Sequence, residues 1–263
     1  MATFFGEIGA LSSRAVDDEE ADSEPTYNIS LDCKSKSESK TDCKLLLLAV
    51  GDLAIAFSKS YLISDTSTHL FDVKYSAVKA EFDSIMYTGG ALPSSRSQKA
   101  ASAYQVSKDV IVCEVPALVP EEINMDVCLM VLDHINCQEG VCITSKHMAN
   151  FKSSEPVESY TPFIKALATS KFSRSHAMDK LQAPNFISGF AAAFLAEFQV
   201  KNKAALCVIN FVDTDFLDSS NVQMFERLQE VDLNVKIDFA TDAKAKLTKY
   251  IKARHCIESN LYT

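Results

Sequence analysis

The stretch Leu45-Leu46-Leu47-Leu48-Ala49-Val50-Gly51-Asp52 decides the fold class. Six consecutive apolar residues predict a strand that is buried on both faces of a sheet, because a strand with one wet face would alternate with polar residues. Gly51 and Asp52 then predict a tight turn and the start of a helix over 53–63. Strand, turn and helix form the first unit of a three-layer α/β fold.

Further apolar segments continue this pattern downstream. Buried strands are predicted over 80–87, 109–115, 141–144 and 204–211, and the alternation over 233–239 predicts a half-buried strand. Helices are predicted over 120–135, with an inner stripe of Ile123, Val127, Val131 and Ile135, over 184–200, after the capping-box pattern Ser220–Gln223, and over 242–255. We therefore predict a single three-layer α/β/α domain over 44–256, with a mostly parallel central sheet.

The net charge of −9 over 263 residues is concentrated in the N-terminal part of the chain. Residues 1–43 hold ten acidic and four basic residues, a net charge of −6, and few apolar groups. Such a segment cannot offset the entropy cost of ordering, so we predict a disordered acidic segment over 1–43. The remaining 220 residues carry a net charge of −3 and form no basic domain, which argues against a nucleic-acid partner.

The apolar tip of that segment holds Phe4 and Phe5. Two phenylalanines on an otherwise acidic tether fit either a second linear docking element or a short peptide packed onto the domain. The sequence leaves both interpretations open.

Eight cysteines, most of them inside apolar segments, predict buried free thiols. The first eleven residues lack the basic and apolar regions of a signal peptide, so we expect a reducing, cytoplasmic setting without disulfides. The longest apolar run, Leu45–Phe57, contains Asp52 and falls short of the ~20 residues that a membrane span needs. No membrane span is expected.

Catalytic and cofactor motifs are missing from the sequence. Seven glycines form neither a dinucleotide-binding nor a phosphate-binding loop, and no G-x-S-x-G nucleophile motif occurs. His134, Cys137, Cys142 and His147 have the spacing of a small zinc site, but a regular helix, turn and strand would keep them apart. We therefore predict no cofactor, no metal and no catalytic residues.

Three acids follow the predicted strand 204–211: Asp213, Asp215 and Asp218. The carboxyl end of a strand is where α/β sheets place ligands, so these acids could hold a cation. Acids before a helix are also ordinary caps, and that interpretation is favoured.

Two features fit protein binding better. The helix that contains Phe186, Phe190, Phe194 and Phe198 is apolar nearly all round, so it is either central or covered by a partner, and we favour a dimer face. The chain ends in a basic helix followed by Leu261-Tyr262-Thr263. With a free carboxylate, this ending offers an apolar anchor, an aromatic ring and a negative charge to a pocket on another protein.

The chain resembles the proteasome assembly chaperone 1 family at both ends, through Met1-Ala2-Thr3-Phe4-Phe5-Gly6-Glu7 and Glu258-Ser259-Asn260-Leu261-Tyr262-Thr263. Shorter stretches between them also resemble it: Leu45–Phe57, Thr161–Leu167, Gln182–Asn185 and Val212–Asp215. Residues 65–110 and the acidic tether match poorly.

This resemblance implies a three-layer α/β/α chaperone without enzymatic activity. It implies a heterodimer with a proteasome assembly chaperone 2-like subunit that binds the ring of proteasome α-type subunits, aids its assembly and blocks early docking of activators. Leu261, Tyr262 and Thr263 would enter a pocket between neighbouring α-subunits. The cytoplasm, nucleus and surface of the endoplasmic reticulum are the expected locations. A small-molecule enzyme of the phosphorylase or hydrolase type, with Asp213 and Asp215 at its site, and an adaptor that only displays its tail are the alternatives.

Overall fold

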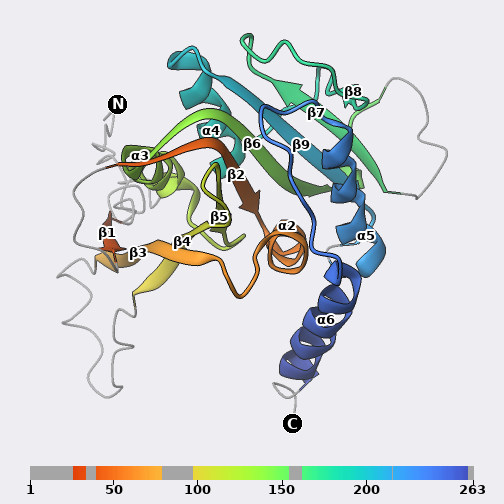
Figure 1. Ribbon diagram of the computed structural model, residues 1–263, viewed down its shortest axis with the longest axis horizontal. Coiled ribbons are helices and arrows are strands. Elements are labelled where there is room, and N and C mark those ends of the chain that lie inside the picture. The colour runs from red at the N-terminus through yellow and green to blue at the C-terminus, as the bar shows by residue number, and fades with distance from the viewer. Residues whose placement is uncertain (1–25, 34–39, 79–96, 154–161, 215, 260–263) are drawn as a thin grey trace, which may run out of the picture. The chain divides into compact units, whose positions relative to one another are not determined.

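The computed structural model describes residues 26–33, 40–78, 97–153, 162–214 and 216–259 (Figure 1). The chain divides into two compact units, one of Met1–Asn28 and Ser76–Arg96, the other of Ile29–Tyr75 and Ser97–Thr263. Of the first unit, only short strand ends are described. The candidate sites lie in the described part of the second unit.

The predicted strand–turn–helix unit is confirmed. In β2 (Thr41–Val50) the residues from Leu45 to Ala49 are completely buried. Gly51 turns the chain with a φ of 88°, a conformation that favours glycine. The helix α2 (Asp52–Phe57) follows and loosens into one π-helical turn, η1 (Ser58–Leu62).

The strands of the described residues form one nine-stranded sheet in the order β1-β3-β4-β5-β2-β6-β9-β7-β8. The centre is parallel, because β2 pairs in parallel with β5 and β6, and β6 with β9. The flanking pairs β3–β4, β4–β5 and β7–β9 are antiparallel. The remaining strands are β1 (Thr26–Cys33), β3 (Thr68–Val78), β4 (Gln98–Gln105), β5 (Val110–Val115), β6 (Ile135–His147), β7 (Phe163–Ala168), β8 (Asp179–Lys180) and β9 (Ala204–Val212).

Helices cover both faces of this parallel centre (Figure 1). On one face α2 contacts α5 and α6, and on the other α3 packs against α4. Val141 and Ile143 of β6 belong to the core under α2, whereas Gly140 lies under α4. Neighbouring strand residues face opposite sides, so the three-layer α/β/α architecture is confirmed. The bounds are α3 (Asn124–His134), α4 (Gly189–Val200), α5 (Ser219–Gln223) and α6 (Ala243–Ser259), with 3₁₀ turns η3 (Glu121–Ile123), η4 (Met148–Asn150) and η5 (Met224–Glu230).

The first four strands differ from the sequence-based expectation. Residues 26–33 form β1, inside the segment predicted to be disordered, and β2 begins at Thr41 rather than after residue 43. The strands β3 and β4 were not predicted, because buried polar residues interrupt their apolar pattern. The strand predicted over 80–87 lies outside the described residues, and the proposed domain division at 43 and 256 stays a prediction.

The predicted strand over 233–239 is wrong. Its alternation is real, since Leu233, Val235, Ile237 and Phe239 are partly buried against the core while their neighbours are exposed. The backbone, however, runs as an irregular extended segment without strand pairing. Alternating burial alone therefore does not make a strand; a hydrogen-bonding neighbour is also needed.

The predicted helices are confirmed with shifted bounds. The inner stripe Ile123, Val127, Val131 and Ile135 is buried, although Ile135 already starts β6. The helix predicted from Pro184 begins at Gly189. The helix predicted after Ser220 is capped by Asp218, which accepts from the Ser220 N–H at 3.0 Å and from its hydroxyl.

The thiols that the structure describes are free, and all except Cys33 are buried. Burial raises the pKa of Cys43 and Cys128 to about 12, so these thiols stay protonated and unreactive. Among the described residues, no helix is both long and apolar enough to cross a membrane.

Candidate functional site

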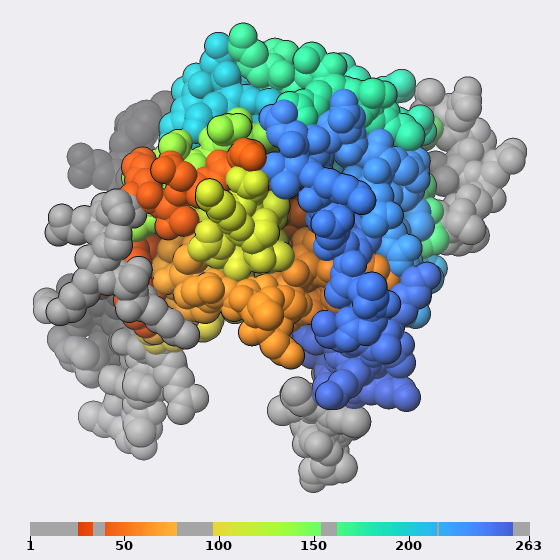
Figure 2. Space-filling view, viewed as in Figure 1, coloured from red at the N-terminus to blue at the C-terminus, as the bar shows by residue number. Residues whose placement is uncertain are grey.

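The C-terminal helix α6 packs against α2 and η1, which follow β2. Leu247 is fully buried and Ala243 nearly so, and both belong to the core that α2 and η1 share. Tyr250 and Ile251 pack against the same core from the next turn. In the space-filling view the dark blue C-terminal segment lies beside the orange residues that follow β2 (Figure 2).

Polar contacts hold both ends of α6. Ahead of the helix, the Ala240 N–H donates to the Tyr61 carbonyl at 2.9 Å. The Tyr61 hydroxyl donates to Glu226 at 2.7 Å, and burial together with this carboxylate raises the pKa of the phenol. Near the other end, Arg254 lies 3.8 Å from Asp52, the first residue of α2. The helix thus lies along the α2–η1 segment, and its last five residues extend beyond the Arg254–Asp52 pair.

The exposed side of α6 is basic. Lys244, Lys246 and Arg254 form ion pairs with Glu226, Asp242 and Asp52. Lys249 and Lys252 are exposed and make no ion pair with the residues that the structure describes. The buried apolar side fixes the helix on the domain, and its exposed Lys249 and Lys252 would attract an acidic partner.

The predicted docking residues Leu261, Tyr262 and Thr263 lie outside the described residues, four positions or fewer beyond the structure's last described residue. Phe4 and Phe5 also lie outside the described residues. Both sets stay predictions. The described element nearest to the first set in the sequence is α6, and the one nearest to the second set is β1.

The acids after β9 do not form a site in the described part of the chain. Asp213 is exposed, and Asp215 lies outside the described residues. Asp218 caps α5, and hydrogen bonds from Ser220 lower its pKa. This is the capping role that the sequence favoured.

Of the four phenylalanines assigned to the predicted dimer face on α4, three are buried within the chain, and the dimer face itself stays a prediction. Phe190, Phe194 and Phe198 are at most 3% exposed, because the sheet and α3 cover them within the chain. Gly140 makes this possible, since a Cβ there would lie 2.6 Å from the Phe194 ring and 2.7 Å from the Phe198 ring. Only Phe186, which precedes the helix, is exposed.

The four residues with zinc-like spacing are separated along α3 and β6, and each has a different environment. His134 pairs through Nδ1 with the Met130 carbonyl, and His147 Nδ1 accepts from the Ala149 N–H. Cys137 lies beside Cys43 of β2, and Cys142 beside Cys207 of β9. No cluster of metal-binding side chains occurs among the residues that the structure describes.

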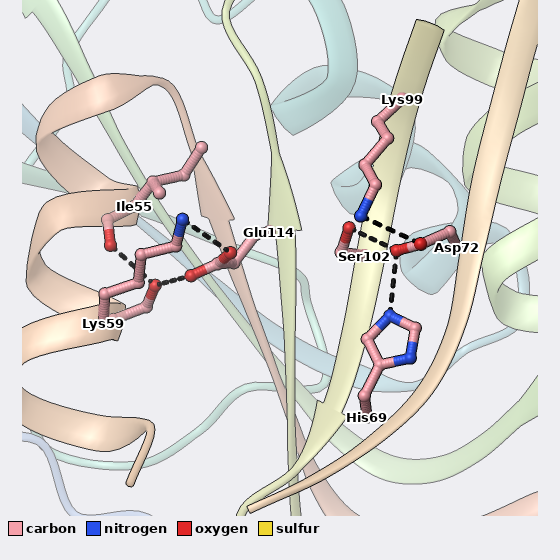
Figure 3. Close-up of polar contacts among 8 residues, drawn as sticks. Ile55, Lys59, His69, Asp72, Lys99, Ser102 and Glu114 are labelled. Atoms are coloured by element: carbon pink, nitrogen blue, oxygen red, sulfur yellow. Dashed lines mark hydrogen bonds and ion pairs between the residues drawn. The ribbon is translucent and has the colours of Figure 1, made fainter. Parts of the chain in front are cut away.

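Sequence reasoning missed a row of buried polar side chains across β3, β4 and β5 (Figure 3). Asp72 pairs in register with Ser102, and Ser102 with Glu114. Asp72 accepts from the Ser102 hydroxyl at 2.6 Å and from Lys99 at 2.9 Å, and His69 Nε2 lies 2.9 Å away. Burial would raise its pKa, but these partners outweigh burial and lower the pKa to about 2.

Glu114 occupies the other end of this row. It accepts from the Ser58 hydroxyl at 2.6 Å and lies 3.8 Å from Lys59 Nζ. Burial dominates here and raises the pKa of the carboxyl group. Asp72 is bonded to residues of β3 and β4, and Glu114 to residues of η1, so we interpret the row as structural packing. No signal in the local sequence pattern marked these polar positions as buried.

Together, a parallel-centred sheet with helices on both faces and a C-terminal helix packed on α2 and η1 define a three-layer α/β protein with an exposed basic helix. A family model described as proteasome assembly chaperone 4 matches residues 26–263. The chain therefore belongs to the proteasome assembly chaperone family.

Curated relatives that carry the name proteasome assembly chaperone 1 align over the full length. The relative from Danio rerio is 26% identical over 288 residues, and that from Xenopus tropicalis 27% over 298 residues; both alignments cover 100% of each chain. The human relative is 27% identical over 122 residues, 46% of this chain and 42% of the relative.

Solved structures show the same fold at low sequence identity. The archaeal proteasome activator PbaB of Pyrococcus furiosus superposes with a TM-score of 0.54 at 11% identity, over 89% of this chain and 99% of that one. Its PbaA, an archaeal homolog of proteasome-assembly chaperone, gives 0.52 at 11% identity, over 91% and 93%.

Proposed function

We propose that this chain is one subunit of a heterodimeric chaperone that binds the ring of proteasome α-type subunits. In this role it promotes ring assembly and blocks early docking of activators, and it has no catalytic activity of its own. Membership of the proteasome assembly chaperone family supports the chaperone role. The pairing with a proteasome assembly chaperone 2-like subunit rests on the resemblance alone.

We assign ring docking to Leu261, Tyr262 and Thr263. The observation that carries this assignment is the anchorage of α6, whose buried Leu247 and ion pair between Arg254 and Asp52 hold it against the centre of the fold. Four extended residues reach at most about 14 Å beyond Ser259. A pocket would therefore be entered by a short segment with a fixed base, which lowers the entropy cost of docking.

Tyr262→Ala in the chain co-purified with its partner subunit should weaken binding to isolated α-rings. The loss of an aromatic anchor in a closed pocket is worth about 2 kcal/mol, or roughly thirtyfold in Kd. One alanine added after Thr263 should have a similar effect, because it moves the carboxylate. Equilibrium binding to labelled α-rings measures both.

The matched control is one alanine added before Met1, which lengthens the chain equally and should leave Kd unchanged. Circular dichroism of each variant should match the parent, because the changes lie outside the packed core. Equal α-ring affinity for the Tyr262→Ala, extended and parent proteins would refute the assignment of docking to this segment.

A further inference from the structure

Two adjoining hollows lie beside β7 and β8, which form one end of the sheet (Figure 1). Their volumes are about 480 Å³ and about 360 Å³, and Lys152, Pro184 and Asn185 line both of them. Because the hollows share these walls, they form one continuous groove. We call it the lysine groove, after the lysines that line it: Lys146, Lys152, Lys165 and Lys180.

The lysine groove is basic, although the molecule as a whole is acidic. Asp179 is the one acidic residue among the residues that line the two hollows, so the groove carries a net charge of +3 from four lysines and one aspartate. The whole chain carries −9. A hollow that gathers charge of one sign raises the local concentration of ligands of the other sign. The groove therefore suits an anionic ligand.

Three of the four lysines have no counter-charge in the described part of the chain. Lys165 pairs with Asp179 at 3.0 Å, whereas Lys146, Lys152 and Lys180 form no ion pair with a described residue. Lys146 is half-buried: it donates to the Phe186 carbonyl at 2.8 Å and lies 5.1 Å from the centre of that ring. Burial lowers its pKa, because a cation removed from water without an anion is costly. A carboxylate in the groove would offset that cost.

The walls of the groove are fixed by contacts within the chain. The Asn185 side chain accepts from the Lys152 N–H at 2.7 Å and donates to the Lys152 carbonyl at 2.7 Å, so the two walls that both hollows share are joined. Phe151 packs against Phe163 and Phe211, with ring centres 5.0 Å and 4.9 Å apart. A ligand would therefore meet a surface that is already ordered, which lowers the cost of binding.

Strand direction explains why the lysines gather on this face. Ile164 and Ala166 of β7 belong to the core under α2, so Lys165 between them faces the other side of the sheet. Lys146 is the next-to-last residue of β6, at the carboxyl end of the parallel strands. Open α/β sheets commonly place ligands at that end.

The spread of the lysines favours a chain of charges over a single anion. Lys146 lines only the smaller hollow, Lys165 and Lys180 line only the larger one, and Lys152 lines both. Four cations along two hollows match several carboxylates in sequence, rather than one phosphate or carboxylate at a point of convergence. Phe186 at one end and Phe151 at the other add apolar contact for a peptide backbone and its side-chain stems. Nucleic-acid binding is disfavoured by the acidic net charge of the chain.

We propose that the lysine groove is a binding site for an extended peptide segment of another protein that is rich in aspartate and glutamate. The carboxylates pair with Lys146, Lys152 and Lys180, and the peptide passes over the shared wall between the two hollows. This inference does not depend on the proposed docking of residues 261–263.

The test is the double variant Lys152→Glu and Lys180→Glu in the full-length chain. The probe is a fluorescein-labelled oligoglutamate peptide of about eight residues, about 27 Å long when extended. Fluorescence anisotropy should show binding to the parent that weakens as salt is added. The double variant should bind about tenfold more weakly or worse, because like charges then face each other. Both positions are exposed, so the thermal unfolding midpoint should stay within a few degrees.

The matched control is the double variant Lys108→Glu and Lys171→Glu. Both lysines are exposed and form no ion pair with a described residue, and both lie near the amino end of the parallel strands, before β5 and after β7. This variant should keep the parent affinity. Equal weakening in the two double variants would show attraction to overall charge only and would overturn the proposal.

Three further outcomes would also overturn the proposal. Loss of peptide binding in Lys249→Glu and Lys252→Glu, with the groove variant unaffected, would place the acidic ligand on α6. Glutarate that binds as tightly as the peptide would make the groove a site for small anions. Tighter binding of an RNA oligonucleotide of equal charge, through the same lysines, would make it a nucleic-acid site.

Discussion

The two halves of the central sheet are buried by different means. Around β2, β6 and β9 the packing is mainly apolar, from Leu47 under α2 to Gly140 under the rings of α4, and Glu139 and Asn210 are its fully buried polar exceptions. Across β3, β4 and β5 the sheet buries a row of polar groups, and Asp72 and Glu114 are satisfied by serine, lysine and histidine partners. The first half depends mainly on shape and the second mainly on hydrogen-bond partners.

This difference indicates how each half should fail. An apolar half loses stability when volume is removed, with little dependence on pH. A half with buried carboxylates keeps its volume but depends on protonation, because the folded and unfolded states hold these protons with different affinity. Substitutions in each half can therefore separate the two modes.

The largest effect is expected in the apolar half. Phe194→Ala should lower the free energy of unfolding by about 3–5 kcal/mol, since it removes a buried ring and leaves a cavity between α4 and β6. Phe186→Ala is the matched control in the same segment, and because Phe186 is exposed its effect should stay within about 1 kcal/mol. Urea unfolding at neutral pH measures both, and equal losses would contradict the burial of Phe194 and Phe198.

A smaller, pH-dependent effect is expected at Asp72. Its folded-state pKa, about 2, is below the unfolded value of about 3.9, so it contributes stability that is present above about pH 4 and is lost as the pH falls toward about 2. Asp72→Asn should therefore lower stability at neutral pH and flatten the acid limb of the stability profile. Urea midpoints measured between about pH 2 and pH 7 test this.

Glu114→Gln is the comparison within the same row, and the sign of its effect is opposite. Because burial raises the folded-state pKa of Glu114, the parent gains stability from this group as the pH falls, and loses it as the pH rises from about 4.3 through the raised value. The glutamine variant should lack this change. Parallel profiles for the two variants would show that the row does not titrate as described.

The smallest effect is expected at Asp213. It is exposed at the end of β9, so Asp213→Asn should change stability by no more than about 0.5 kcal/mol. The enzyme alternative assigned this residue to a site, whereas the chaperone proposal predicts unchanged α-ring binding. A clear loss of ring binding in this variant would move the docking surface toward the β9 loop.

The apolar half could be predicted from the sequence, whereas in the polar half only β5 was predicted. Leu45–Val50 and Ala204–Phe211 are continuous apolar runs, which occur in strands buried on both faces. In β3 and β4 the buried positions include Asp72 and Ser102. The burial of Asp72 depends on its partners Lys99 and Ser102, which are 27 and 30 positions away in the sequence. A local pattern does not contain that information.

The candidate site shows the same limit. The basic residues of α6 and their helical spacing were predictable, but the ion pair between Arg254 and Asp52 joins residues about 200 positions apart. The burial of Phe190, Phe194 and Phe198 likewise depends on elements distant in the sequence, because α3 and the sheet cover them.

The anchorage of α6 also has a consequence for quality control. Its contacts, through Leu247, Tyr61 and Asp52, all involve the strand–helix unit that forms the centre of the sheet. The helix is therefore held in place only in molecules whose central strands have already folded. A partner that needs the helix in this position would select native molecules from misfolded ones and, by mass action, stabilise those it holds.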